Sequence, residues 1–115
     1  MSPPIAVLVS GRGSNLQVLI DASDAAQANI ALVASNRPKA PALARAAAAG
    51  IPTLVLLQRD FPDRETYDSH LAQQLREAGI QWVFLAGFMH ILSPAFVRAF
   101  PGRIINIHPS LLPQF

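Results

Sequence analysis

The amino-acid sequence predicts an α/β fold built on an open, doubly wound parallel sheet of five strands and four helices. Short apolar runs, each long enough for a buried strand, alternate along the chain with longer segments whose apolar residues recur at helical spacing. Glycines and prolines stand at the boundaries between these segments, where turns and helix ends favour them. Strands that alternate with helices pair in parallel, because each helix returns the chain to the end where the next strand begins.

The first strand is predicted at residues 5–9, where apolar residues follow one another without interruption. Such a run is typical of a strand that is buried on both faces of a parallel sheet. The next segment has apolar residues at helical spacing over 16–20, and Ser14 or Asn15 is available as its N-cap. Residues 11–14 therefore form a tight loop between the strand and the helix.

The same alternation predicts the remaining elements. They are a strand at 30–34, a helix at 41–49, a strand at 53–57, a helix at 64–78, a strand at 82–86, a helix from 94 to about 100 and a strand at 104–108. Gly50 and Gly79 fit the position that follows a helix end. Ser93 and Pro94 have the order of an N-cap and a first helical residue.

The composition narrows the class of protein. The 115-residue chain is 51% hydrophobic and 14% charged, which fits one globular domain and excludes a charge-rich disordered chain. No apolar run reaches the roughly 18 residues that a membrane helix needs, and residues 1–4 lack the basic segment of a secretory signal. We therefore expect a cytoplasmic protein.

Two further counts exclude classes of site and partner. The absence of cysteine excludes disulfides, a thiolate nucleophile and a cysteine-bound metal. The net charge is +2, and the nine basic residues are scattered singly along the chain, so we do not expect a nucleic-acid partner.

The loop at residues 10–15 has the features of an anion site. Gly11 and Gly13 allow a ligand to approach the backbone, and N–H groups at the start of the next helix suit a phosphate. A dinucleotide fingerprint would need a third glycine where Leu16 stands, and a nucleoside-triphosphate loop would need a Gly-Lys pair that does not follow. A single phosphate monoester remains as the predicted ligand. The alternative is an ordinary glycine turn that is capped by its own polar side chains.

A second loop at the carboxyl end of a predicted strand spans residues 87–92. Ligands bind at these ends in open parallel sheets. The loop is apolar, so its backbone groups can hydrogen-bond a flat heterocycle while its side chains enclose it. The alternative is a buried loop that covers the core.

The last predicted strand carries two polar side chains. Asn106 and His108 are two positions apart, so both side chains leave the same face of the strand. An amide donor beside an imidazole can stabilise an oxyanion and move a proton in acyl transfer. The alternative is a structural histidine, which is the interpretation that we prefer for His70 and leave open for His90.

Three segments, in their order and spacing, carry a resemblance to a known family. Residues 10–15 read Ser-Gly-Arg-Gly-Ser-Asn, residues 87–94 read Gly-Phe-Met-His-Ile-Leu-Ser-Pro, and residues 106–113 read Asn-Ile-His-Pro-Ser-Leu-Leu-Pro. Together they resemble the glycinamide ribonucleotide formyltransferases of purine synthesis, over nearly the whole chain. The last motif is shared by the wider formyl-tetrahydrofolate enzymes and leaves the acceptor open, whereas the Gly-Ser-Asn loop selects a nucleotide.

The resemblance implies a Rossmann-like formyltransferase domain, a role for each matching residue, formyl-tetrahydrofolate as co-substrate, and no metal. The matching residues are Gly13, Ser14 and Asn15 for the ribonucleotide phosphate, Met89, His90, Ile91 and Leu92 for the pterin, Arg64 for the folate glutamate, Asn106 for the formyl group and the folate, and His108 for proton transfer.

Two of these residues need comment. Arg64 stands in the first turn of a predicted helix, where a cation opposes the helix dipole, so a carboxylate partner explains its position better than helix stability does. Asp63 or Glu65 are alternative partners for it. His90 stands where the family commonly has arginine, which leaves the backbone contacts to the pterin intact and puts a second contact to the folate tail in doubt.

The family continues for roughly as many residues again and supplies an aspartate that orients the catalytic histidine. None of the seven acidic residues here follows the predicted strand at 104–108. We therefore expect residues 1–115 to be the N-terminal part of such a domain, inactive alone and prone to self-association through its apolar end. The alternatives are a formyl-tetrahydrofolate hydrolase and a non-catalytic half-domain that binds phosphate or folate.

Overall fold

Five parallel strands form one sheet in the computed structural model, which describes residues 2–11, 13–90 and 92–107. The strands are β1 (Pro4–Val9), β2 (Asn29–Ser35), β3 (Thr53–Val55), β4 (Trp82–Leu85) and β5 (Ile104–Asn106). The helices are α1 (Ser14–Ala26), α2 (Pro41–Ala48), α3 (Arg64–Glu77) and α4 (Pro94–Ala99), and a short 3-10 turn η1 (Gln58–Asp60) precedes α3. The strand order is β3-β2-β1-β4-β5, which confirms the predicted α/β class.

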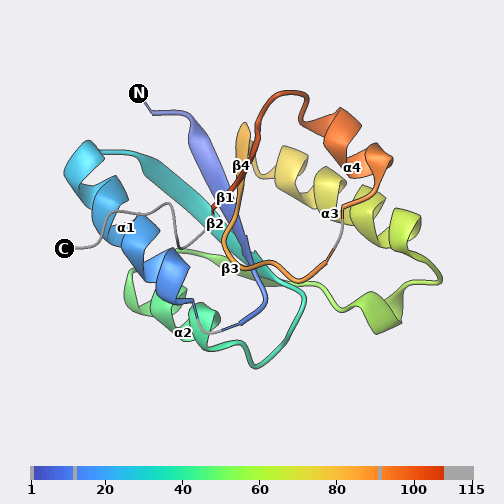
Figure 1. The fold of residues 1–115 in the computed structure, drawn as a ribbon, viewed down its shortest axis with the longest axis horizontal. Coiled ribbons are helices and arrows are strands. Elements are labelled where there is room, and N and C mark those ends of the chain that lie inside the picture. The colour runs from blue at the N-terminus through green and yellow to red at the C-terminus, as the bar shows by residue number, and fades with distance from the viewer. Residues whose placement is uncertain (1, 12, 91, 108–115) are drawn as a thin grey trace.

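Helices cover both faces of this sheet, with α1 and α2 on one side and α3 and α4 on the other (Figure 1). The central strand β1 contributes to both cores. Ala6 and Leu8 pack in the cluster under α3 and α4, whereas Val7 and Val9 pack in the cluster under α1 and α2. This double burial explains why the sequence of β1 is uninterruptedly apolar instead of alternating.

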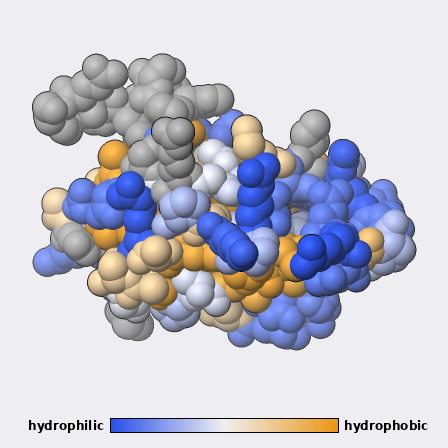
Figure 2. All heavy atoms as spheres, turned by 90° about the horizontal axis from the view of Figure 1, so that it is seen from below, coloured by the Kyte–Doolittle hydropathy of each residue, from blue (hydrophilic) through white to orange (hydrophobic). Residues whose placement is uncertain are grey.

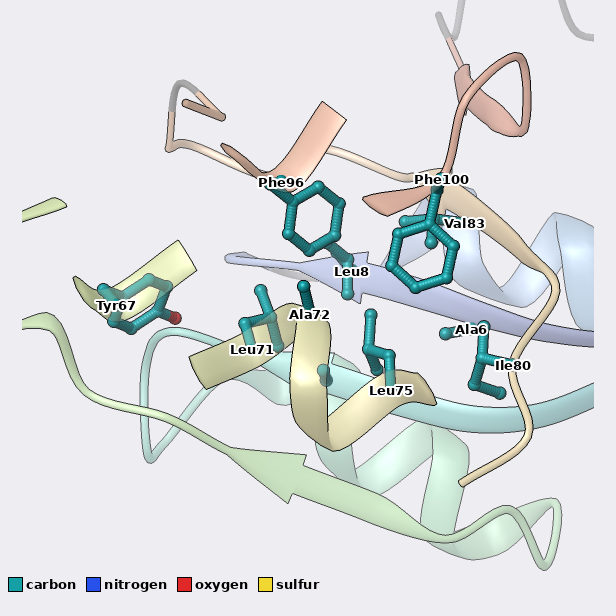
Figure 3. Packing of buried hydrophobic residues seen from close by; sticks show 11 residues of the cluster. Ala6, Leu8, Tyr67, Leu71, Ala72, Leu75, Ile80, Val83, Phe96 and Phe100 are labelled. Carbon is teal, nitrogen blue, oxygen red and sulfur yellow. The ribbon is translucent and has the colours of Figure 1, made fainter. Parts of the chain in front are cut away.

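The core beneath α3 and α4 is built from aromatic and branched side chains (Figure 3). Tyr67 and Leu71 of α3 lie against the sheet beside Phe96 of α4, and the rings of Phe96 and Phe100 are 5.4 Å apart. Phe96 is fully buried, and burial of such a side chain contributes about 1.5–3 kcal/mol to stability. This packing holds α3 and α4 in place against one face of the sheet.

Three strands end earlier than the sequence predicts: β4 ends one residue earlier, at Leu85, and β3 and β5 each end two residues earlier. The third strand ends at Val55, which pairs with Ser35, the last residue of β2. The strand predicted at 104–108 ends at Asn106, which pairs with Leu85, the last residue of β4. The apolar run continues through Leu57 after β3, and Ile107 follows β5. At both places the neighbouring strand has ended, so there is no further ladder to join.

The strand order reverses beside β1, because the chain adds β2 and β3 on one side and β4 and β5 on the other. Ligands bind in such sheets at the carboxyl ends of the strands that flank this point.

Figure 2 shows that the right-hand end of the molecule, where Figure 1 places η1 and the start of α3, is mostly hydrophilic. No helix in the described part of the chain is long and apolar enough to cross a membrane.

Candidate active site

The loop after β1 is fixed by backbone hydrogen bonds to two helices. The N–H of Gln17 donates to the carbonyl of Gly13 at 2.8 Å, which starts α1, and the N–H of Ala42 donates to the carbonyl of Gly11 at 3.3 Å. Ala42 lies in the first turn of α2, whose N-cap residue makes no side-chain hydrogen bond. The carbonyl of Gly11 therefore satisfies a helix N–H that would otherwise lack a partner.

Gly13 occupies a position that only glycine fits. Its φ is +83°, and a Cβ atom on it would lie 2.6 Å from both Cα and Cβ of Ala42. The two predicted phosphate residues that follow are at the helix start, because Ser14 begins α1 and Asn15 is half buried in its first turn. The backbone thus runs close to α2 and presents the N-terminal turn of α1 at the carboxyl end of β1.

Ser10 links three strand ends, a role that the sequence analysis missed. Its side chain is buried, its hydroxyl donates to Oδ1 of Asn36 at 2.7 Å, and it accepts the N–H of Met89 at 2.7 Å. Asn36 follows β2 and Met89 follows β4, so one hydroxyl joins the loops after β1, β2 and β4. The only sign of this role in the sequence was that Ser10, a polar residue, directly follows a strand predicted to be buried.

The loop after β4 is held from the other side by Asp68 of α3. Asp68 is fully buried, and its Oδ1 lies 2.7 Å from Nε2 of His90. Its Oδ2 accepts the N–H of Ser93 at 2.6 Å. The His90 side chain is 4% exposed, so it faces the protein and is not presented to a ligand.

Asp68 was not among the residues expected to have a role, although its spacing on α3 indicated a buried charge. Asp68 stands in line with Leu71, Ala72 and Leu75, the residues that α3 buries, so a charge occupies the apolar stripe of the helix. A carboxylate in such a place needs a partner. What the pattern does not contain is the identity of that partner.

Tyr67 packs beside this pair and remains neutral. Its hydroxyl donates to the carbonyl of Leu56 at 2.8 Å, and its ring centroid is 4.9 Å from that of His90. Burial and, secondarily, the charge of Asp68 raise the pKa of Tyr67 to about 12. At neutral pH Tyr67 is therefore a hydrogen-bond donor and a packing surface.

The other residues of loop 87–92 divide between the core and the surface. Phe88 and Leu92 pack against the cluster under α3 and α4, whereas the Met89 side chain is 74% exposed. The loop therefore covers the core, as the structural alternative predicts, and also presents an apolar side chain outward. Ile91 lies outside the described residues.

Arg64 begins α3 and its side chain is exposed. The carboxylate of Asp63 caps this helix by accepting the N–H of Thr66 at 2.7 Å, and the hydrogen bonds from Thr66 hold the pKa of Asp63 below its ordinary value. Within residues 2–11, 13–90 and 92–107, Arg64 makes no ion pair with Asp63 or with Glu65. The two local partners that the sequence offered are thus not engaged with it.

Asn106 is exposed at the end of β5, in register with Leu85 of β4. It stands at the same edge of the sheet as the two loops joined by Ser10. His108, the other predicted catalytic residue, lies outside the described residues. In the described ranges, no group of three histidine, aspartate or glutamate side chains is placed to hold a metal ion.

Known proteins resemble this chain in sequence and in fold. Residues 4–115 match the family model described as formyl transferase. The chain belongs to the formyl transferase family. Among relatives of this formyl transferase chain, the phosphoribosylglycinamide formyltransferase of Escherichia coli (strain K12) is 48% identical over 113 residues, which cover 96% of this chain and 53% of that protein.

A second relative is a longer protein whose name describes it as trifunctional. The trifunctional purine biosynthetic protein adenosine-3 of Drosophila pseudoobscura pseudoobscura is 56% identical, over 96% of this chain and 8% of that protein. The formyl transferase chain therefore spans about half the length of its bacterial relative and a small part of the insect one.

Solved structures agree with the fold of this formyl transferase chain. Glycinamide ribonucleotide transformylase 1 from Symbiobacterium toebii superposes with a TM-score of 0.90 at 40% identity, over 99% of this chain and 55% of that one. Phosphoribosylglycinamide formyltransferase from Coxiella burnetii, solved in complex with CHES, gives a TM-score of 0.88 at 44% identity, over 100% of this chain and 55% of that one.

Proposed function

We propose that the protein to which this chain belongs transfers a formyl group from formyl-tetrahydrofolate to the primary amine of glycinamide ribonucleotide. Membership of the formyl transferase family supports the type of reaction. The names of the similar proteins, which are phosphoribosylglycinamide formyltransferases and purine biosynthetic proteins, support the nucleotide as acceptor. We also propose a cytoplasmic location.

The observation that carries this proposal is the junction at Ser10. Because Ser10 bonds the N–H of Met89, the glycine loop after β1 and the apolar loop after β4 are neighbours at one edge of the sheet. β5 pairs with β4, so Asn106 lies at that same edge. A phosphate-bearing acceptor on the first loop and a heterocyclic donor on the second would bring their reactive groups together near Asn106.

We assign the binding contacts as follows. The phosphate is held by the backbone of Gly13 and by Ser14 and Asn15 at the start of α1, where N–H groups and the helix dipole favour an anion. The pterin is held by backbone groups of residues 89–92. The N–H of Met89 is already bonded to Ser10, so the contacts fall to the other groups of this segment.

The tail of the folate is assigned to the opposite end of the site. Arg64 is exposed in the first turn of α3 and, within the described residues, has no ion pair. A guanidinium in that state suits the carboxylate of the folate glutamate. His90 is not assigned to the tail, because its side chain is turned to Asp68.

In the proposed reaction, the amine nitrogen attacks the formyl carbon and forms a new C–N bond. The carbonyl oxygen takes up the negative charge of the tetrahedral intermediate, which the amide of Asn106 and the imidazole of His108 stabilise. The bond from the formyl carbon to the folate nitrogen then breaks. His108 moves the proton from the attacking amine to that leaving nitrogen, so charge and protons balance.

Two alternatives remain distinct from this proposal. In a formyl-tetrahydrofolate hydrolase, water would replace the amine, and the purine-biosynthetic relatives favour the amine. A half-domain that only binds ligands is what we expect of residues 1–115 made alone. A mispositioned imidazole loses most of the gain from proximity, and no acidic residue follows β5 in this sequence.

The test measures formation of formylglycinamide ribonucleotide by the purified full-length protein. Asn106→Ala should lower turnover by about two to three orders of magnitude, as expected for one oxyanion donor. His108→Ala should lower it by roughly two to four orders of magnitude, as expected for a general acid and base. Asn29→Ala, at the exposed start of β2, is the matched control. Near-normal turnover in both site variants would contradict the proposal.

A further inference from the structure

Asp68 is a fully buried carboxylate that the proposed reaction does not use. It lies on α3, yet both of its oxygens are bonded to the loop after β4. Oδ1 is 2.7 Å from Nε2 of His90, and Oδ2 accepts the N–H of Ser93 at 2.6 Å. One side chain therefore holds the loop at two points, His90 and Ser93.

Because this carboxylate is buried, both of its oxygens need hydrogen-bond donors. A charged group that is removed from water must have its oxygens satisfied by donors, or its burial is strongly destabilising. The N–H of Ser93 is one such donor, at the N-cap position of α4. The imidazole of His90 is the other, and it is charged only when protonated.

Packing around His90 fixes the orientation of the loop as well as its position. The ring centroid of His90 is 4.9 Å from that of Tyr67 and 5.7 Å from that of Phe88. His90 is thus enclosed, whereas the side chain of its neighbour Met89 is 74% exposed. If the contact to Asp68 were lost, nothing polar among the described residues would hold the imidazole inside.

We propose that Asp68 is a positioning residue, which keeps the backbone of Met89, His90 and Leu92 in the conformation that receives the heterocycle of the donor substrate. This role rests on the proposed function, because it assigns that loop to the folate. A loop that is already ordered loses less conformational freedom when a ligand binds, so its affinity is higher. Asp68 acts through His90 and Ser93 and does not touch the ligand.

The experiment compares Asp68 variants in the full-length protein. Asp68→Ala removes both anchors, and we expect the KM for formyl-tetrahydrofolate to rise by about tenfold or more, the range for loss of buried hydrogen bonds to a charged group. The KM for glycinamide ribonucleotide should stay within about twofold, because the phosphate loop keeps its own contacts. Glu77→Gln, on the exposed side of the same helix, is the charge-matched control.

Asp68→Asn distinguishes positioning from a need for charge. Its amide oxygen can accept the N–H of Ser93, and its NH₂ group can donate to Nε2 of a neutral His90. Both anchors then survive, so we expect the KM for formyl-tetrahydrofolate to remain within about threefold of the parent value. His90→Phe keeps the ring packing but removes one anchor, and it should weaken folate binding even if Asp68→Ala does not fold.

Direct binding of formyl-tetrahydrofolate, measured calorimetrically without acceptor, separates this inference from the proposed function. A protein that binds the folate through an Asp68-dependent loop but forms no formylated nucleotide would overturn the function and retain the inference. Equal changes in both KM values of folded Asp68→Ala would overturn the inference. So would unchanged folate affinity in His90→Phe.

Discussion

Ser10 shows how much one buried hydroxyl can hold together. It has no charge and no contact with solvent, yet it donates to Asn36 and accepts from Met89. Removal of the hydroxyl leaves the part-buried N–H of Met89 and the part-buried amide oxygen of Asn36 without that partner, and an unsatisfied polar group costs up to about 1–3 kcal/mol when it is buried. The hydrogen bonds of Ser10 therefore stabilise the strand-end junction more than the packing of its small side chain does.

We expect Ser10→Ala to lower the free energy of unfolding by about 1–3 kcal/mol. The single tryptophan, Trp82 of β4, reports urea unfolding by its fluorescence. Ser69→Ala, an exposed serine on α3, is the control and should change stability by less than about 0.5 kcal/mol. An equal effect of both substitutions would show that the Ser10 hydrogen bonds add nothing.

Tyr67 gives a prediction about pH, because it is the only tyrosine in the sequence. Its pKa is raised to about 12 by burial and by the charge of Asp68, whereas an unfolded tyrosine titrates near about 10. The unfolded chain therefore loses this proton first as pH rises. The contribution of the protonated Tyr67 hydroxyl to the free energy of unfolding is fully present below pH 10 and is lost as pH rises toward 12.

Absorbance at the tyrosinate band should therefore titrate near pH 12 in the native protein and near about 10 in urea. Tyr67→Phe should remove the band and flatten the alkaline loss of stability. Native titration at the ordinary tyrosine pKa would place the hydroxyl in water and contradict its bond to Leu56.

At the scale of elements, the contact between α2 and the loop after β1 decides which glycines can be replaced. Gly13 and Gly50 both have positive φ values, +83° and +74°. A Cβ on Gly50 would meet nothing within 4 Å, whereas one on Gly13 would lie 2.6 Å from Ala42. The two positions share the backbone strain and differ only in the collision with α2.

Gly50→Ala should therefore cost about 1–2 kcal/mol from the left-handed backbone alone. Gly13→Ala should cost more and should also displace the loop, so that inorganic phosphate no longer shifts the amide resonances of residues 13–15. The parent chain and Gly50→Ala should both show that shift at millimolar phosphate. If both variants responded to phosphate in the same way, the prediction that this loop binds the anion would be wrong.

The same elements show what the sequence determines. The alternation of apolar periods predicts all five strands and four helices, because each period reflects burial of that segment itself. The ends of β3 and β5 were placed too late, because a strand stops where its neighbour stops. The pairing of Asp68 with His90 joins two layers that only the folded chain brings together, so the spacing of α3 indicated a buried charge without its partner.

At the scale of the whole molecule, one side of the sheet keeps an apolar hollow near β4 and β5. It is lined by Ile5, Ala26, Trp82, Phe84 and Ile105, and Ile105 is 39% exposed. Exposed apolar patches of this kind favour association. The apolar end at residues 111–115, which the sequence suggested for this role, lies outside the described residues.

We expect residues 1–115, produced alone, to self-associate through this hollow. Sedimentation velocity should show a concentration-dependent increase in mass, and Ile105→Glu should reduce it. Val18→Glu places the same charge on an equally exposed valine of α1, which does not line the hollow, and it should leave association unchanged. A chain that stays monomeric at high concentration would contradict this expectation.

The central place of β1 also has a consequence for the nascent chain. Ile5 pairs with Ile30 on one side and with Trp82 on the other, so the two edges of the same strand are completed at very different moments of synthesis. β2 precedes β4 in the chain, so it leaves the ribosome first and can pair with β1 before β4 is available. The other edge stays open until β4 has emerged, and an unpaired apolar edge is prone to aggregate. A holdase that binds nascent chains should therefore act on this protein between the emergence of β2 and that of β4.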